Sequence, residues 1–265
     1  MRPRPGEIAH AQAIGISLWQ WLEPAGEKWR ALRDLTEEEK KKLCSALADQ
    51  LLSKGLHFEV ANLIGHVYIL TKEEPWTPLR DAREFSVLLN STGRMDKASL
   101  GIAVCMGDRG AALEEANKTL EDYRKNINKY LNWVMEKPGR MKELENIYVI
   151  HGENFINEKI IGTVSSILAP NLPNPEKPII AYANMETEGV AKFSARTTDL
   201  VVHKGVNLGE TLRIAAEKYG GKGGGHNIAA GCQVPLDQIE NFIGMVNDLV
   251  GKQLKGETIG SNNNP

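Results

Sequence analysis

Hydrophobic residues in the first half of the chain recur at intervals of three or four positions, which is typical of amphipathic helices. This spacing predicts helices over residues 7–22, 37–55, 58–71, 80–91, 97–107 and 109–136. Thr36 and Glu39 have the sequence of a capping box, so we expect the second helix to begin there. Pro138 and Gly139 end the last helix. The pattern therefore predicts a helical region with linker helices over residues 1–140.

The pattern changes after residue 140, where short runs of β-forming residues alternate with helical segments. Strands are predicted over residues 147–150, 179–183, 189–195 and 200–203, and helices over residues 158–168, 207–219 and 236–250. This alternation indicates an α/β fold class (α+β overall), in which a helical N-terminal half precedes a mixed β-sheet domain with packed helices over residues 141–252. Residues 253–265 are mostly polar and are expected to form a disordered tail.

Charge and cysteine content exclude several classes of protein. The 32 Lys and Arg residues nearly balance 34 Asp and Glu residues, which excludes a strongly basic nucleic-acid binder but permits a local basic surface. The three cysteines are widely separated and form no CxxC pair, so they suit buried positions in a reducing compartment. No apolar run approaches the ~20 residues of a membrane span, and the N-terminus has no signal-peptide pattern. We therefore expect a cytoplasmic protein with no membrane partner.

A glycine-rich string at residues 220–231 is the strongest local signal. Its candidate phosphate-binding residues are Lys222, Gly223, Gly224, Gly225 and His226. Glycines permit close approach of a ligand to the backbone, and consecutive N–H groups can form an anion-binding nest. The string is neither a P-loop nor a dinucleotide-binding fingerprint. The residues alone leave two interpretations open, a phosphate-binding loop and a flexible hinge.

Two further strings contain arginines that could bind anions. Ser194 and Arg196 lie at the end of a predicted strand, and a guanidinium offers a rigid fork for phosphate; an ordinary surface arginine is the alternative. Residues 90–96 (Asn-Ser-Thr-Gly-Arg-Met-Asp) read as a turn between helices, with Arg94 paired to Asp96 or to a helix end. The remaining histidines form no metal-binding motif, and no Ser-His-Asp arrangement stands out.

Taken in order, residues 89–96, 193–196 and 223–231 resemble the C-terminal part of RecJ-like single-strand nucleases of the DHH phosphoesterase superfamily. The similarity covers about residues 30–250, nearly the whole chain. Residues 71–81 and 151–154 look like the archaeal branch, which includes the GINS-associated nuclease. The resemblance implies that Ser194, Arg196, Gly224, Gly225 and His226 contact the nucleic-acid backbone. Arg94 matches the linker arginine of the family, for which no firm role is assigned.

The chain departs from this family in one respect. Such nucleases carry an N-terminal DHH domain that binds two Mn²⁺ or Mg²⁺ ions, which clamp the attacking water and the leaving oxygen. This sequence has no Asp-His-His and no Asp-x-Asp motif. We therefore expect no metal or other cofactor in this chain and no hydrolysis by it alone, whether it is a truncated or a stand-alone form.

Four functional interpretations follow from the resemblance. The first is the single-stranded DNA- or RNA-binding portion of a RecJ-like 5′→3′ exonuclease of DNA replication or repair. The second is a replisome interaction module that docks GINS without its own catalysis. The third is a relative of small DHH phosphodiesterases that cut cyclic dinucleotides or short RNA, and the fourth is an RNA-binding tail like that of alanyl-tRNA synthetases. The long linker helices argue against the third interpretation, and the Gly93-Arg94 linker argues against the fourth.

Overall fold

The computed structural model describes residues 35–55, 60, 63–75, 77–137 and 139–259. The chain divides into two units, residues 1–71 and 72–265, which are described separately. The predicted helix over residues 7–22 lies outside the described residues. In the first unit, α2 spans Glu37–Ser53. Its capping box is confirmed, because Thr36 Oγ1 accepts from the Glu39 amide at 3.2 Å and Glu39 Oε2 accepts from the Thr36 amide at 2.8 Å.

The predicted helix over residues 58–71 is wrong for residues 64–71, although Val60 is helical. Residues 64–71 adopt no helix. Gly65 and the neighbouring β-branched residues Ile64, Val67 and Ile69 disfavour a helix, since glycine loses backbone entropy there and branched side chains lose rotamer freedom. The apolar spacing was therefore not sufficient to decide the structure of this segment.

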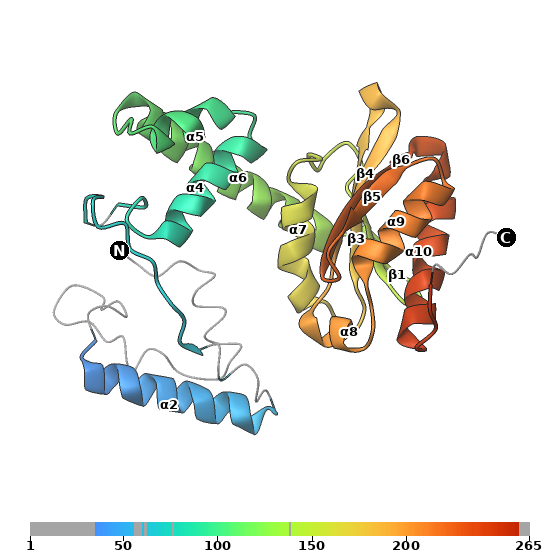
Figure 1. Cartoon of the computed structure of the whole chain (residues 1–265), viewed down its shortest axis with the longest axis horizontal. Coiled ribbons are helices and arrows are strands. Elements are labelled where there is room, and N and C mark those ends of the chain that lie inside the picture. The colour runs from blue at the N-terminus through green and yellow to red at the C-terminus, as the bar shows by residue number, and fades with distance from the viewer. Residues whose placement is uncertain (1–34, 56–59, 61–62, 76, 138, 260–265) are drawn as a thin grey trace. The chain divides into compact units, whose positions relative to one another are not determined.

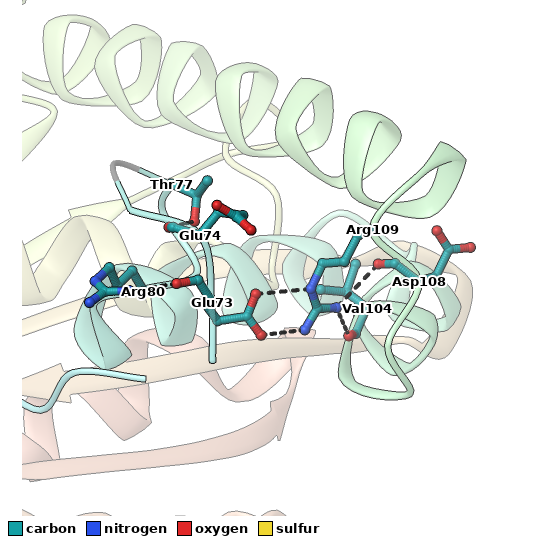
Figure 2. Close-up of polar contacts among 7 residues, drawn as sticks. All are labelled: Glu73, Glu74, Thr77, Arg80, Val104, Asp108 and Arg109. Carbon is teal, nitrogen blue, oxygen red and sulfur yellow. Dashed lines mark hydrogen bonds and ion pairs between the residues drawn. The ribbon is translucent and has the colours of Figure 1, made fainter. Parts of the chain in front are cut away.

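The second unit begins with a connector that an ion pair fastens to the helices. Glu73 receives hydrogen bonds from Arg109 on both carboxylate oxygens, at 2.6 and 3.0 Å (Figure 2). The remaining Arg109 nitrogen donates to the carbonyl of Val104 at 2.5 Å, and Arg80 donates to the Glu73 carbonyl at 2.6 Å. This fork-to-fork pairing lowers the pKa of the Glu73 carboxyl below its ordinary value, chiefly through the hydrogen bonds from Arg109.

Three helices follow the connector: α4 (Ala82–Arg94), α5 (Ala98–Cys105) and α6 (Ala111–Glu136). Asp81 caps α4 by accepting from the amides of Arg83 and Glu84. The prediction of a turn over residues 91–96 is wrong at its start, because α4 continues through Arg94. Ser91 and Thr92 are buried there and satisfy their hydroxyls on carbonyls of the preceding turn, at 2.7 and 2.8 Å.

A mixed sheet forms the rest of the second unit, with strand order β1-β2-β3-β4-β6-β5. The strands are β1 (Met141–Glu143), β2 (Tyr148–His151), β3 (Ile179–Met185), β4 (Val190–Arg196), β5 (Lys222–Gly225) and β6 (Ala229–Pro235). Only the β2–β3 pair is parallel, and α7 (Ile161–Leu168) connects these two strands. The predicted α/β class with a mixed sheet is confirmed; β1 was not predicted.

Helices lie on both faces of the sheet (Figure 1), and alternate residues of the strands enter two separate cores. Ile180, Phe193 and Val234 face α9 (Leu208–Lys218) and α10 (Ile239–Leu254). Ala181 and Ile150 face α7 and the helices before the sheet. Because successive side chains of a strand point to opposite faces, the same strand supplies both cores.

Two predictions in this part are wrong. Residues 200–203 belong to helix α8 (Asp199–His203), where Asp199 suits the first helical turn and its carbonyl contacts the His203 ring at 2.7 Å. The glycine-rich segment is a β-hairpin, since residues 222–225 pair with β6. At the C-terminal end, α10 continues to Leu254 and Ile259 is buried against the α9–α10 core.

Candidate nucleic-acid interface

The side chains of Ser194 and Arg196 lie on one face of β4. Their neighbours Phe193 and Ala195 enter the α9–α10 core, so Ser194 and Arg196 point to the opposite side, toward α7. Ser194 Oγ accepts from Ser165 Oγ at 3.4 Å. The strand's period of two residues therefore separates the structural positions from the candidate binding positions.

Arg196 is half-buried and held by several acceptors. Its Nε donates to Ser166 Oγ at 2.8 Å, and Nη1 donates to the carbonyls of Ala195 and Ala230 at 2.7 and 3.3 Å. Nη2 has no acceptor among the described residues. It lies beside Gly162, where a Cβ atom would come within 3.3 Å of Nη2 and 3.2 Å of Ser194 Oγ. The missing side chain at residue 162 thus leaves room at the free end of this guanidinium.

Arg94 lies near Arg196, although 102 positions separate them in the sequence. Arg94 Nη1 donates to the carbonyl of Lys159 at 2.8 Å, and Lys159 forms an ion pair with Asp96. Burial, and less strongly the nearby charge of Arg94, lowers the pKa of Arg196 from its ordinary value. Neither arginine forms an ion pair with a carboxylate of the described residues. Two cations without an acidic partner favour an anion at this position.

The glycine hairpin extends this site across the sheet. Strand register places Gly231 and Gly224 in line with Ser194, and Ala229 opposite Arg196. A Cβ atom at Gly224 would meet nothing within 4 Å. Next to this line, His226 is exposed and its amide donates to the Ala229 carbonyl at 2.8 Å, which closes the hairpin. The result is a strip of sheet with little side-chain cover.

The other glycines of the hairpin have a packing role. A Cβ atom at Gly223 would lie 2.2 Å from that of Cys232, on the opposite face of the sheet. Gly225 has φ +147°, and its carbonyl lies 2.3 Å from where a Cβ of Gly209 in α9 would be. A Cβ atom at Gly225 would itself lie 2.6 Å from the Ala229 carbonyl oxygen, so Gly223 and Gly225 require glycine for close pairing with β6, whereas Gly209 requires it so that α9 can approach β5. Contacts of Gly223 and Gly225 with a ligand stay a prediction, limited to their backbone atoms.

Two lysines lie on the same face as Ser194. Lys222 and Lys192 are both opposite Gln233, one on each side of β6. The sequence reasoning named Lys222 but missed Lys192, together with Ser166 and Lys159. The signal for Lys192 was the alternation Lys192-x-Ser194-x-Arg196, which places these side chains on one face of a strand. Ser166 and Lys159 lie in or near α7 and could be found only from the tertiary structure.

Within the described residues, no group of three or more His, Cys, Asp or Glu side chains could hold a metal ion. Among the same residues, no helix combines the length and the apolar character needed to cross a membrane. The arrangement of arginines, serine and open backbone is suited to binding an anion by hydrogen bonds.

Comparisons with known proteins identify part of this architecture. Residues 146–252 match the DHHA1 domain family. A curated but uncharacterized protein of Methanocaldococcus jannaschii is 33% identical over 224 residues, which cover 84% of this chain and 45% of that protein. The chain therefore spans about half the length of this relative.

Solved structures show the same fold. RecJ of Thermus thermophilus in complex with Mn²⁺ has a TM-score of 0.52 and 18% identity, with 94% of this chain and 33% of RecJ covered. The complex of that RecJ with Mg²⁺ has a TM-score of 0.51 and 18% identity, with 94% and 35% covered. Residues 146–252 are thus similar to DHHA1 domains, and together with the helices before them the chain has the fold of about a third of RecJ.

Proposed function

We propose that this chain is the nucleic-acid-binding region of a RecJ-like single-strand exonuclease. In this proposal Arg94, Ser194 and Arg196 hold a phosphate of the strand. One observation supports it above the others: the charge of Arg94 is near enough to lower the pKa of Arg196, and neither guanidinium forms an ion pair with a carboxylate of the described residues. A phosphate accepts hydrogen bonds from both guanidinium groups and relieves their mutual repulsion.

The exposed backbone of the β5–β6 hairpin offers a path for the nucleic-acid strand beyond this phosphate site. From Arg196 the open line of Ala229, Gly231 and Gly224 leads across β6 to the edge strand β5. His226 lies at one end of β5 and Lys222 at the other. An extended single strand can lie along such a surface and meet backbone amides and basic side chains with no base-specific contact. Hydrolysis is assigned to a metal-binding DHH domain, where two ions would activate water.

The test is fluorescence anisotropy with a 5′-phosphorylated single-stranded oligonucleotide at low salt. We expect the Arg196→Ala/His226→Ala variant to bind at least about tenfold more weakly, since each charged hydrogen bond that the substitutions remove is worth ~1.5–3 kcal/mol. Arg213→Ala is the matched control, because Arg213 is an exposed arginine of α9 paired with Glu217. Equal affinity of the double variant and the wild type would contradict the proposal, provided that circular dichroism shows both to be folded.

Docking of a replisome protein such as GINS is a second candidate function, favoured by one apolar surface. At the end of α5, Ile102 is 61% exposed and Met106 is 83% exposed. Large apolar side chains exposed together are typical of protein interaction sites. If this surface docks GINS, Ile102→Ser/Met106→Ser will abolish co-elution with GINS, whereas Arg196→Ala/His226→Ala will leave it intact.

A further inference from the structure

A pocket of about 450 Å³ lies on the face of the sheet opposite the candidate interface. Val149 and Tyr182 line it, and both belong to the α9–α10 core, whereas Ser194 and Arg196 face α7. Ile243 of α10 forms part of its wall. The pocket is therefore separate from the site described above.

One wall of the pocket is basic. It carries Lys137, Arg140 and Lys142. The Arg140 guanidinium lies 3.9 Å from the centre of the Trp133 ring, and its Nη1 donates to the Trp133 carbonyl at 2.5 Å. Its Nε and Nη2 have no acceptor within the described ranges, and neither lysine forms an ion pair there. The structure thus fixes one guanidinium in place and leaves its remaining donors available to an anion.

The sheet surface in the pocket is aromatic. His151 and Tyr182 are opposite each other in the β2–β3 pair, and their rings stack at 4.4 Å with an angle of 11° between them. His151 Nε2 is buried without a hydrogen-bond partner in the described part of the chain. Burial, with a smaller contribution from Glu240, raises the pKa of Tyr182 to about 12, so its hydroxyl stays protonated at neutral pH. Phe193 stacks on the other side of Tyr182 at 4.9 Å, so the ring face left to a planar heterocycle is that of His151, with the Tyr182 hydroxyl at the edge of the stack.

Two carboxylates complete the lining of the pocket. Glu153 and Glu240 form no ion pair with a basic side chain of the described residues. Carboxylates accept hydrogen bonds from amino, ring N–H and hydroxyl groups but repel phosphate. A ligand that satisfies both kinds of group carries an anion at one end and hydrogen-bond donors at the other. The volume falls within the usual range for small-ligand sites, which is roughly 300–1,000 Å³.

We propose that this pocket binds a nucleoside monophosphate. The phosphate lies against Arg140 and the two lysines, and the base packs against the His151 ring, at the end of its stack with Tyr182. The carboxylates accept hydrogen bonds from the ribose hydroxyls or from the amino group of the base. This assignment rests on the pocket alone and does not depend on the function proposed for the opposite face.

Isothermal titration calorimetry of the 265-residue chain with AMP, GMP, CMP and UMP tests the proposal. We expect at least one nucleotide to bind, and to bind about tenfold or more weakly to Lys137→Ala/Lys142→Ala, because this variant removes two charged donors. Both lysines are exposed, so the fold should persist in this variant. Lys118→Ala/Lys125→Ala in α6 is the matched control for charge, and Arg196→Ala is the control for the opposite face; both should keep wild-type affinity.

Three results would overturn the proposal. The first is the absence of nucleotide binding at millimolar concentration. The second is a loss of binding in Arg196→Ala with none in the double lysine variant, which would move the nucleotide to the opposite face. The third is binding of inorganic phosphate as tightly as of the nucleotides, because a simple anion site does not recognise a base. Weaker binding of both phosphate and adenosine than of AMP would support it.

Discussion

Arg196 illustrates how one side chain can be both anchored and available. Three acceptors fix Nε and Nη1, whereas Nη2 has no acceptor among the described residues and lies beside Gly162. A lysine could not do both, because its ammonium group is a single centre on a flexible stem. Arg94 is held in a similar way by the Lys159 carbonyl. Because both guanidinium groups are already held in place, a phosphate that binds them has less side-chain entropy to remove.

If both arginines contact one phosphate, their effects on binding will be coupled. We expect Arg94→Ala and Arg196→Ala each to weaken oligonucleotide binding, and the double variant to deviate from additivity by about 0.5–3 kcal/mol. The salt dependence should change as well, with the slope of log K against log salt becoming shallower by ~0.7 for each phosphate that is no longer neutralised. Anisotropy titrations at several salt concentrations measure both quantities. Strict additivity would place the two arginines on different phosphates.

At the scale of elements, the close packing of α9 on the β5–β6 hairpin depends on glycine residues. Strand β5 has almost no side chains, so its position is set by pairing with β6 and by the close approach of α9. The Cβ of an alanine at residue 209 would fall 2.3 Å from the Gly225 carbonyl oxygen. The hairpin would have to move to relieve this clash.

We therefore predict that Gly209→Ala lowers the free energy of unfolding by about 1–3 kcal/mol, as overpacking does. Gly244→Ala is the matched control, because Gly244 is a helical glycine of α10 with nothing within 4 Å of its Cβ position. Alanine there should be neutral or stabilise the protein by up to ~1 kcal/mol. Urea unfolding of both variants gives the comparison. Equal stability of the two variants would show that α9 does not need the glycine.

The sequence was informative for elements that carry a periodic pattern and less so for the others. The helices α4 to α6 and the strands β3 and β4 were predicted because their apolar residues recur at helical or alternating spacing. The hairpin was not, because glycine has low strand propensity and β5 exists through its partners. Likewise, Arg94 and Arg196 were each named, but their proximity depends on the contact of Arg94 with the Lys159 carbonyl just before α7, which no local pattern contains.

At the scale of the second unit, the candidate interface joins two parts of the fold. Arg94 comes from the helices and Arg196 from the sheet. Few polar contacts link these parts in the described residues: Arg94 to the Lys159 carbonyl, Lys159 to Asp96, and Tyr123 to Thr163 at 3.0 Å. Residues of α6 and α7 also pack in one apolar core, which holds the helices against the sheet. The geometry of the phosphate site therefore depends on how the helices pack on the sheet.

The Glu73–Arg109 pair should make the stability of this unit depend on pH. Because pairing lowers the pKa of Glu73 in the folded state, its contribution is complete above the ordinary carboxyl value of 4.5 and is lost as the pH falls through the lower folded value. We expect Glu73→Gln to lower the thermal midpoint at pH 7 and to make little difference at strongly acidic pH. Glu74→Gln, which removes a neighbouring exposed carboxylate, is the control and should leave the midpoint unchanged at both values. A constant deficit of Glu73→Gln at every pH would contradict the ion-pair explanation.

In strand β4, the alternation of side chains serves both the core and the candidate interface. Its even-numbered residues, such as Ser194 and Arg196, face the proposed anion site, and its odd-numbered residues, such as Phe193 and Ala195, fill the α9–α10 core. Inserting or deleting a single residue here would exchange the two sets, which would bury a guanidinium among apolar side chains and present a phenyl ring to the ligand. We therefore expect this strand to tolerate substitution better than a change in its length.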